Sequence, residues 1–377
     1  MRLALAGGGT GGHLLPGLAV AEELEKEPGS ESLFFLSSRD PEESGARLRR
    51  CRRVRVPAAA LSGSFLRRPR SLIENLAGWR LSRRELAGFQ AEAILGLGGF
   101  VSAPPVLAAA TLRIPVVLYE QNTVPGRANL FLTRFARRIA LGFPLRRGAF
   151  PAGKTFLTGN PILPAAAEGG PLGAGEEWGL REGAFTLLVM GGSRGAHFLN
   201  RLMIESIPFW GDRTGGIQIL HLSGAEDENL VRSAYRTGGI RARVWPFWDR
   251  MGWLYRRADL LIARSGALTL SEAAHWGLPA LLVPYPYATD GHQAMNAGYF
   301  QEQGAAIAVE EGALTGRKLA ETVTGLMRDR ASLERMREAA RRLARPESAR
   351  AILELVREAI KENKIRNPKH EIRNKFE

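Results

Sequence analysis

The sequence predicts an α/β protein built from two parallel-sheet domains. Strands alternate with helical stretches, several strands are continuously apolar, and the whole pattern begins again near the middle of the chain. Continuously apolar strands are typical of a parallel sheet that helices cover on both faces. The length of 377 residues agrees, since a chain of this size usually forms about two or three domains.

Each half opens with an apolar strand that runs into a glycine-rich loop and then a helix. The opening strand is Leu3–Ala6 in the first half and Thr186–Met190 in the second half. Further strands of the first half are expected at Ser32–Ser37, Ala93–Leu97, Pro115–Glu120 and Arg138–Gly142. Those of the second half are expected at Ile217–Leu222, Leu260–Ala263 and Ala280–Val283.

A segment rich in Pro, Gly and Ala, Asn160–Glu176, is typical of a linker between domains. We therefore expect an N-terminal domain over residues 1–162 and a C-terminal domain over residues 163–344. A further helix is expected over residues 345–360. Residues 361–377 are expected to form a disordered tail without chemistry.

The chain is strongly basic, with a net charge of +14. Most of the excess lies in residues 1–160, which hold 23 Lys and Arg against 12 Asp and Glu. A basic face indicates nucleic acid, anionic lipid or a phosphorylated ligand as a partner. No zinc-finger spacing or aromatic RNA-binding pattern accompanies the charge, so nucleic acid is not expected.

The sequence also argues against an exported or membrane-spanning protein. Cys51 is the single cysteine, which excludes a disulfide framework and fits a reducing compartment. Glycines follow the first six residues and leave no room for the apolar core of a signal peptide. The uncharged stretch Ala93–Leu112 contains glycines and prolines, and is interpreted as a strand, a loop and the start of a helix.

The first glycine-rich loop matches the pattern G-x-G-x-x-G at Gly7, Gly9 and Gly12. Backbone N–H groups at a helix N-terminus bind phosphate, because the unpaired donors and the helix dipole both favour an anion. The pattern therefore predicts a diphosphate or dinucleotide site, although a tight turn would also need some of these glycines. His13 follows directly, where an imidazole can act as a general base or bind a phosphate.

A second glycine-rich loop, Gly191–Ala196, repeats the arrangement and adds the hydroxyl of Ser193. A single dinucleotide-binding domain would leave one of the two loops unused. Two such loops suit a ligand with a diphosphate in the middle and a different group at each end. A metal site has little support, since the sequence holds no Asp-x-Asp pair and no cluster of His and Cys.

Two polar stretches of the second half are candidate ribose and sugar sites. Glu272 lies one or two turns into the helix that follows Arg264, where a carboxylate can accept both hydroxyls of a ribose. Asp290–Gln293 with Asn296 is suited to sugar hydroxyls. Helix capping or a favourable charge near a helix N-terminus is the alternative for both. In the first half, Tyr119–Asn122 closes a strand and is either part of the site or a buried hydrogen-bond network.

Apolar residues at helical spacing lie beside arginines between Phe65 and Arg84. This pattern is typical of a patch that binds a membrane surface, where each Lys or Arg contributes about 1 kcal/mol at an anionic leaflet. An ordinary amphipathic helix with a solvated basic face would give the same pattern. The residues predicted for the membrane patch are Phe65, Leu66, Arg67, Arg68, Arg70, Ile73, Trp79 and Arg80.

Taken together, six motifs resemble, in order and spacing, the MurG family of UDP-N-acetylglucosamine transferases. They are GGGTGGHLLPGLA (Gly7–Ala19), EQN (Glu120–Asn122), GNP (Gly159–Pro161), GGSRGA (Gly191–Ala196), RSGALTLSE (Arg264–Glu272) and DGHQAMNA (Asp290–Ala297). The resemblance covers roughly residues 1–345, and six motifs in order are far more specific than any one of them.

The resemblance implies the GT-B fold, in which a cleft that holds the site separates two Rossmann-like domains, and the last helix returns to the first domain. It implies an inverting, metal-independent enzyme without a cofactor. The reaction would transfer GlcNAc from UDP-GlcNAc to the C4 hydroxyl of undecaprenyl-linked lipid I, giving lipid II for peptidoglycan. A peripheral protein at the cytoplasmic face of the bacterial inner membrane is expected. Its partners would include the anionic membrane surface and the cell-wall synthesis and division proteins.

By the same resemblance, the second domain binds UDP and the first domain binds the acceptor. Ser193 would contact the phosphates, Glu272 the ribose, and Trp248 with its neighbours the uracil. His13 would act as the catalytic base or as a diphosphate contact, and both roles stay open. The other residues implied in substrate binding are Thr10, Gly11, Gly12, Asn122, Ala267, Leu268, Thr269, Leu270, Ser271, His292 and Gln293.

Three residues depart from the family pattern. Tyr119 stands where many members have His, Phe100 where they have Tyr, and Leu163 where they often have Arg. Loss of that arginine should weaken a nucleotide contact unless another arginine replaces it. Two other activities stay open, a UDP-sugar transferase acting on diacylglycerol and a UDP-GlcNAc 2-epimerase. The epimerase needs no membrane surface, so the basic patch argues against it.

Overall fold

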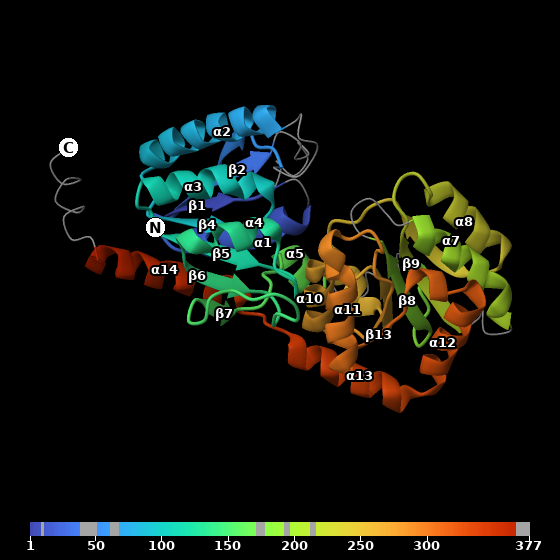
Figure 1. The fold of residues 1–377 in the computed structure, drawn as a ribbon. Helices are drawn as coiled ribbons and strands as arrows, with labels where there is room; N and C mark the ends of the chain where they lie inside the picture. Colours follow the sequence, from blue (N-terminus) through green and yellow to red (C-terminus); the bar gives the residue numbers. More distant parts are fainter. Residues whose placement is uncertain are drawn as a thin grey trace. The chain divides into compact units, whose positions relative to one another are not determined.

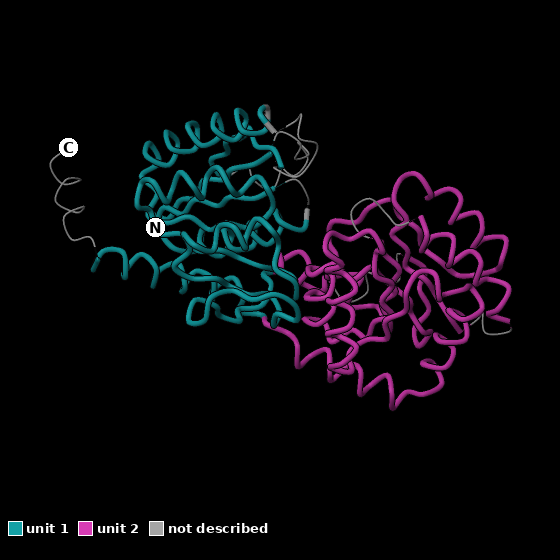
Figure 2. The backbone as a smooth tube through the Cα atoms, in the orientation of Figure 1, with its two compact units in different colours: residues 1–161, 346–377 teal, residues 162–345 magenta. Residues whose placement is uncertain are grey.

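The structure is a computed structural model that describes residues 1–8, 11–37, 51–60, 68–170, 178–191, 197–211 and 216–366. The chain forms two compact units, coloured separately in Figure 2. Unit 1 is Met1–Pro161 with Pro346–Glu377, and unit 2 is Ile162–Arg345. Each unit is built around one parallel sheet, which confirms the predicted α/β class with two Rossmann-like sheets (Figure 1).

The sheet of unit 1 has seven parallel strands in the order β3-β2-β1-β4-β5-β6-β7. The strands are β1 (Arg2–Ala6), β2 (Glu31–Ser37), β3 (Arg52–Val56), β4 (Ala93–Gly96), β5 (Val116–Glu120), β6 (Ala136–Leu141) and β7 (Thr155–Leu157). The central strands are apolar because helices cover the sheet. In β1, for example, the side chains from Leu3 to Ala6 have no exposed surface.

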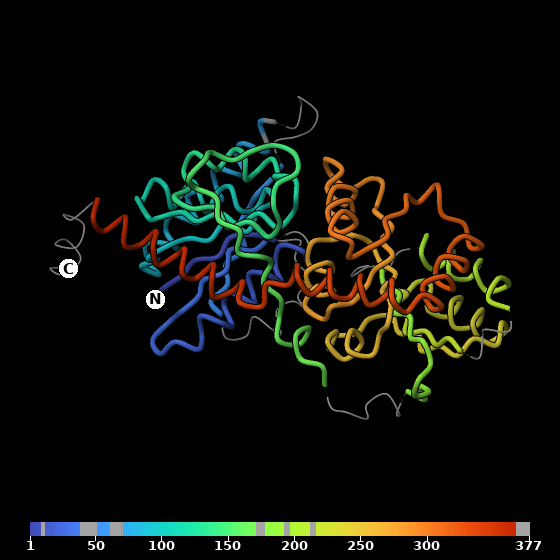
Figure 3. Tube along the Cα trace, turned by 90° about the horizontal axis from the view of Figure 1, so that it is seen from below, coloured from blue at the N-terminus to red at the C-terminus, as the bar shows by residue number. Residues whose placement is uncertain are grey.

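The helices of unit 1 come from both ends of the chain. On one side α2 (Arg68–Phe89) packs against α3 (Ala103–Thr111), and elsewhere α1 (Gly11–Glu25) packs against α14 (Ser348–Arg366). Figure 3 shows α14, in red, running along unit 1 although it is the last helix of the sequence. Ion pairs hold it there: Arg138 of β6 with Glu358 and Glu362, and Arg357 with Glu27.

The last helix continues to Arg366, which corrects the expectation of a disordered tail from residue 361. Tertiary contacts hold this extra length, because Glu362 pairs with Arg138 and the amide of Asn363 donates to the carbonyl of Arg113 at 3.1 Å. Lys364 and Arg366 also lie in the last turn, where the helix dipole favours cations. The remainder of the predicted tail lies outside the described residues.

The sheet of unit 2 has six parallel strands in the order β10-β9-β8-β11-β12-β13. They are β8 (Phe185–Met190), β9 (Ile217–Leu222), β10 (Arg241–Trp245), β11 (Leu260–Ala263), β12 (Ala280–Leu282) and β13 (Ala306–Ala308). The main helices around this sheet are α7 (His197–Ser206), α8 (Glu228–Thr237), α9 (Met251–Arg257), α10 (Ala267–Trp276), α11 (His292–Glu302), α12 (Gly316–Arg328) and α13 (Arg330–Leu343).

Both sheets have the strand order of a doubly wound fold. The direction of winding reverses between β1 and β4 in unit 1 and between β8 and β11 in unit 2. In open α/β sheets, ligands bind outside the carboxyl ends of the strands at such a switch point. The loops that leave these four strands are therefore where a site is expected.

Candidate functional site

The buried carboxylate of Glu272 lies beside the switch point of unit 2. The hydroxyl of Tyr255, on α9, donates to Oε2 of Glu272 at 2.7 Å and lies 3.6 Å from the sulfur of Met190, the last residue of β8. Glu272 is 8% exposed and Tyr255 is 1% exposed. Burial, together with the charge of Glu272, raises the pKa of Tyr255 well above its ordinary value, so its hydroxyl stays a donor. The pair holds a carboxylate in place where hydroxyl groups of a ligand can donate to it.

One serine links the two polar stretches of unit 2. The hydroxyl of Ser265, in the loop after β11, donates to the carbonyl of Gln293 at 2.8 Å. The side chain of Asn296 donates to the carbonyl of Ser265 at 3.2 Å, and the side-chain oxygen of Gln293 accepts the N–H of Tyr285 at 2.9 Å. These bonds fasten the start of α11 to the loop that leads into α10.

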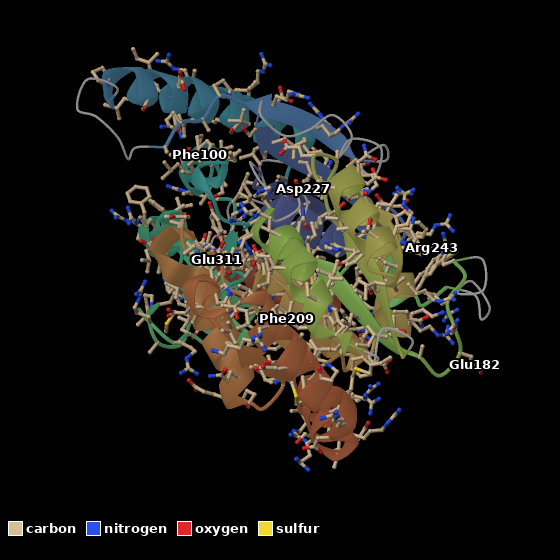
Figure 4. The ribbon with its side chains drawn as sticks, turned by 90° about the vertical axis from the view of Figure 1, so that its right-hand side faces the viewer. Phe100, Glu182, Phe209, Asp227, Arg243 and Glu311 are labelled. Carbon is tan, nitrogen blue, oxygen red and sulfur yellow. The ribbon has the colours of Figure 1, made fainter. Side chains whose placement is uncertain are left out.

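Hydrogen bonds hold the buried side chain of Arg264 at the carboxyl edge of the unit 2 sheet. Its guanidinium donates to the carbonyls of Val283 and Pro284 at 3.1 and 3.2 Å and pairs with Glu311 at 3.1 Å. It is 8% exposed, and its charge lies 5.5 Å from the centroid of the Tyr285 ring. Glu311, labelled in Figure 4, thus fixes the arginine that supports the Tyr285 loop.

A chain of hydrogen bonds positions a histidine at the start of α7. Nδ1 of His197 lies 2.9 Å from Oδ2 of Asp227, the residue labelled in Figure 4 that precedes α8. Asn200 donates to the same carboxylate at 2.7 Å, and its oxygen lies 2.9 Å from Nε2 of His221. Nδ1 of His221 lies 2.8 Å from the hydroxyl of Tyr235. Although burial opposes it, the bonds from Asn200 and His197 lower the pKa of Asp227, so an anion faces His197.

In unit 1, two glycine-containing loops approach each other at the switch point. A Cβ added to Gly7, after β1, would lie 2.7 Å from the Cβ of Leu97, after β4, so a larger residue does not fit. Gly98 has a φ of +91°, which favours glycine. A Cβ added there would lie 3.2 Å from the ring of His13 and 3.5 Å from the amide nitrogen of Asn129. His13 and Asn129 therefore both lie against the backbone of Gly98.

A buried glutamate organises the loop after β5. Glu120 is 3% exposed and accepts hydrogen bonds from the N–H groups of Asn122 at 3.1 Å and Gly126 at 2.8 Å, and from the amide of Asn129 at 2.9 Å. Burial raises the pKa of Glu120, although these bonds oppose the rise. The side-chain oxygen of Asn129 is also buried, and within the described residues it has no hydrogen-bond partner. A buried acceptor without a partner is unusual, because nearly all buried polar groups in folded proteins are hydrogen-bonded.

Comparisons with known proteins identify the family. Residues 3–141 match the glycosyltransferase family 28 N-terminal domain, and residues 186–355 match the family 28 C-terminal domain. A UDP-N-acetylglucosamine--N-acetylmuramyl-(pentapeptide) pyrophosphoryl-undecaprenol N-acetylglucosamine transferase from Geobacter sulfurreducens is 40% identical over 361 residues, which cover 94% of this chain and 97% of the relative. A protein of the same name from Desulfotalea psychrophila is 37% identical and covers 97% of this chain and 98% of its own length. The chain belongs to this family.

Solved structures agree with this assignment. The crystal structure of MurG from Acinetobacter baumannii has a TM-score of 0.75 and 27% identity, and it covers 95% of this chain and 99% of its own. A UDP-GlcNAc 2-epimerase from Neisseria meningitidis, with a TM-score of 0.67 and 14% identity, shares the fold alone. The protein is thus a family 28 glycosyltransferase with the GT-B fold, as the six motifs predicted.

The predicted substrate-binding residues of this glycosyltransferase differ in their surroundings. Leu270 has no exposed surface and belongs to the core, while the hydroxyl of Ser271 donates to the carbonyl of Ala267 at 2.9 Å. Leu268 and Thr269 are half-buried in the first turn of α10. In this stretch Glu272 therefore has the side chain best suited to a ligand, and backbone N–H groups are what the first turn can offer.

The other predicted positions lie at the ends of the same elements. His292 is the first residue of α11, and its Nδ1 lies 2.8 Å from the carbonyl of Thr289. Trp248 packs 5.0 Å from the ring of Trp245 and donates to the carbonyl of Arg250 at 3.1 Å. Gly11 and Gly12 form the first turn of α1 beside His13. The predicted contacts Thr10 and Ser193 lie outside the described residues.

The departures from the family pattern have structural explanations in two cases. The hydroxyl of Tyr119 donates to Oδ1 of Asn160, whose amide donates to the carbonyl of Gln121 at 3.3 Å. Tyr119 is 1% exposed, so it joins the EQN and GNP motifs as a buried link. Leu163 is 6% exposed and packs as an apolar residue before α5 (Pro164–Ala167). Nothing in the structure explains Phe100, which is half-buried.

Several residues at these edges escaped the sequence reasoning. Asn129, Asn200 and Asp227 carry no motif of their own, and their partners are distant in sequence. The sequence could have indicated Gly98 as a site residue, because glycines follow the predicted strand Ala93–Leu97 just as they follow the first strand of the chain. That second glycine pair would have indicated where the His13 loop packs.

The stability of unit 2 should fall with decreasing pH because His221 must stay neutral. Burial lowers the pKa of His221 from 6.5 to about 3. Below pH 6.5 the unfolded chain binds a proton at this side chain while the folded chain does not, so stability is lost between these two pKa values as the pH falls. At pH 5 the loss is about 2 kcal/mol.

Denaturant unfolding at pH 7.5 and pH 5.0 measures this effect. His221→Gln should be less stable at pH 7.5, but its free energy of unfolding should change by about 2 kcal/mol less between the two pH values. If the variant lost as much stability between pH 7.5 and pH 5.0 as the unchanged protein, His221 would not be the cause of the loss.

Proposed function

We propose that this protein transfers GlcNAc from UDP-GlcNAc to the C4 hydroxyl of the muramyl pentapeptide of undecaprenyl-linked lipid I, giving lipid II for peptidoglycan synthesis. The observation that carries the proposal is 40% identity, over 94% of the chain, to a transferase whose name states this donor sugar and this lipid-linked acceptor. The direct test is whether UDP is released only when a lipid I analogue is present.

Unit 2 would bind the donor. The ribose hydroxyls donate to Glu272, which Tyr255 holds in place. The diphosphate accepts from Ser193, from His292 and Gln293, and from the N–H groups of the first turn of α10, which begins at Ala267. The uracil lies by Trp248 and by Phe247, which is 63% exposed. Helix-dipole and N–H donors stabilise the departing UDP, so we propose that no metal ion is required.

Unit 1 would bind the acceptor, with Thr10, Gly11, Gly12 and Asn122 lining it. The C4 oxygen forms its bond to C1 of GlcNAc as the bond from C1 to the phosphate oxygen breaks. His13 takes the hydroxyl proton, and UDP leaves with the bonding electrons. A single in-line displacement inverts the anomeric centre. The ring of His13 and the amide nitrogen of Asn129 both lie against Gly98, which supports this role because it places the proposed base at the switch point of unit 1.

The same test distinguishes two other activities, because each would give a different product. The UDP-GlcNAc 2-epimerases share the fold at low identity, and 14% identity to the Neisseria enzyme gives no support for that reaction here. A UDP-sugar transferase acting on diacylglycerol would differ in its acceptor. No feature of the described residues favours either activity over transfer to lipid I.

The exposed face of α2 supports a peripheral position at a membrane surface, which we propose is the cytoplasmic face of the inner membrane. Leu72, Ile73 and Leu76 are 60%, 69% and 47% exposed, and Arg80, Arg83 and Arg84 are exposed on the same helix. Exposed apolar side chains beside cations suit an anionic lipid surface. In the part of the chain that the structure describes, no helix has the length and apolar character of a bilayer span.

The other residues of the predicted membrane patch give less support to membrane binding. Trp79 is half-buried, with the guanidinium of Arg83 at 5.8 Å from its ring centroid. Phe65, Leu66 and Arg67 lie outside the described residues, and so do the side chains of Arg68 and Arg70. We also propose that cell-wall synthesis and division proteins bind this protein at the membrane surface.

Replacing Arg80, Arg83 and Arg84 with Gln should weaken binding to anionic vesicles about 10- to 100-fold, because each cation contributes about 1 kcal/mol and Arg84 already pairs with Glu85. Co-sedimentation with phosphatidylglycerol vesicles measures the change. Gln at Arg236, Arg328 and Arg342 removes the same charge from exposed positions of unit 2 and is the matched control. Equal losses in both variants would contradict a patch on α2.

A further inference from the structure

Two exposed tyrosines, Tyr285 and Tyr287, form a pair in the loop between β12 and α11, at the carboxyl edge of the unit 2 sheet. Tyr285 is 45% exposed, and Tyr287 is 83% exposed, the largest fraction of any large apolar residue in the described part of the chain. Their ring centroids lie 5.6 Å apart, with 69° between the ring planes. Apolar rings gathered at a surface indicate a binding site, and open α/β sheets bind ligands at this edge.

The loop that carries the tyrosine pair has a fixed conformation. Pro286 separates the two tyrosines, and its ring fixes the φ of the backbone there. The N–H of Ala288 donates to the carbonyl of Tyr285 at 3.2 Å, which closes a tight turn. In the next turn the N–H of Gly291 donates to the carbonyl of Ala288 at 2.9 Å. A ligand that binds the two rings therefore orders little additional backbone, so the entropic cost of binding is low.

Tyr285 is also fastened to the framework of unit 2. Its N–H donates to Oε1 of Gln293 at 2.9 Å, and the guanidinium of Arg264 lies 5.5 Å from the centroid of its ring. Arg264 is itself buried and pairs with Glu311 at 3.1 Å. The tyrosine pair is therefore an apolar surface with a firm support, and Tyr287 is its most exposed part.

The tyrosine pair borders the residues that we propose hold the diphosphate of UDP-GlcNAc. His292 and Gln293 directly follow the loop. The residues proposed for the uridine, Glu272 and Trp248, lie on other elements, so the loop is at the sugar end of the donor. In an in-line displacement the acceptor oxygen approaches C1 of the donor sugar to within about 3 to 3.5 Å. A surface beside the diphosphate residues is therefore within reach of both sugars.

We propose that the tyrosine pair binds the sugar of the acceptor, the muramyl unit of lipid I. This sugar presents C–H groups on its ring faces and methyl groups on its acetyl and lactyl substituents. Tyrosine rings bind such groups by dispersion and by burying apolar surface. The lactyl substituent gives the muramyl sugar one more apolar group than GlcNAc has, which favours it over the donor sugar as the occupant. This role rests on the proposed function, because it takes the donor site as assigned there.

Titration of the full chain with a short-chain lipid I analogue tests this binding, with UDP at saturation so that no transfer takes place. Tyr285→Ala with Tyr287→Ala should raise the Kd for the analogue about tenfold, a change of about 1.4 kcal/mol. The Kd for UDP should change less than about twofold. Tyr285→Phe with Tyr287→Phe keeps both rings and should keep the Kd for the analogue within about twofold of the unchanged protein.

Phe209→Ala with Leu230→Ala is the matched control. Phe209, labelled in Figure 4, is 38% exposed and Leu230 is 53% exposed, and both lie on other elements of unit 2. The control removes exposed apolar surface elsewhere and should bind the analogue normally. Because Tyr285 contacts Arg264, the single variant Tyr287→Ala is a second test. Its side chain is highly exposed, so the melting temperature should not change, while the Kd for the analogue should rise about threefold.

An unchanged Kd for the analogue in both alanine variants of the tyrosine pair, or an equal loss in the control, would overturn the proposal. A raised KM for UDP-GlcNAc with normal binding of the analogue would also overturn it, since the rings would then bind the donor sugar. A loss confined to analogues that carry the peptide would identify the peptide as the occupant in place of the sugar. Failure of the proposed function is seen separately, as absence of UDP release from UDP-GlcNAc by the unchanged protein, and the titration does not depend on that release.

Discussion

Replacing Glu272 with alanine should raise the KM for UDP-GlcNAc about 100-fold and change kcat much less. A carboxylate that accepts both ribose hydroxyls makes two charge-assisted hydrogen bonds of at least about 1.5 kcal/mol each, and these are equally strong in the ground state and the transition state. Glu272 is 8% exposed and already accepts from Tyr255 at 2.7 Å, so little reorganisation is needed on binding.

Direct titration of UDP checks this result without the acceptor. Glu272→Gln keeps the volume of the side chain and should show most of the loss, while Tyr255→Phe removes only the positioning hydroxyl and should lose about tenfold. Binding to anionic vesicles should not change in any of these variants. UDP affinity that is unaltered in Glu272→Ala would show that the ribose lies elsewhere.

Replacing His13 with alanine should lower kcat about 10²- to 10⁴-fold, the usual contribution of a positioned general base. The KM for UDP-GlcNAc should change little, because the proposed donor contacts lie in unit 2. The ring of His13 lies against Gly98, in the loop that leaves β4, so it is placed at the switch point of the unit proposed to bind the acceptor.

The pH dependence of kcat/KM separates the two roles open to His13. Loss of the acidic limb of the profile in His13→Ala, with normal binding of UDP, is expected for a base. A raised KM with an unchanged kcat would instead identify a diphosphate contact. His275→Ala, in the last turn of α10, is the matched histidine control and should keep normal activity.

The strands that the sequence did not reveal are all at the edges of the two sheets. β3 and β7 border the sheet of unit 1, and β10 and β13 border that of unit 2. Central strands are covered on both faces and show as apolar runs, whereas the edge strands β3 (RRVRV) and β10 (RARVW) carry exposed arginines. β7 and β13 have three residues each, which is too short for a pattern.

The site was predictable where its residues are contiguous in sequence. The glycine loops, Glu272 and the Asp290–Gln293 stretch each show as a motif at the end of an apolar strand or at the start of a helix. The contacts that hold these motifs in place could not be predicted in the same way. Tyr255 reaches Glu272 from another helix, and Ser265 reaches Gln293 across 28 positions of the sequence. Such partners are set by the tertiary fold, and no local spacing encodes them.

Acceptor-dependent release of UDP tests the central claim most directly. The full chain would be given UDP-GlcNAc and a short-chain lipid I analogue in metal-free buffer with EDTA, and UDP and the lipid product would be measured together. The account predicts that UDP appears only with the analogue and in equal amount to a β1,4-linked disaccharide product. Binding of UDP-GlcNAc without such release, or formation of an epimerised sugar nucleotide or a diacylglycerol glycoside in its place, would contradict it.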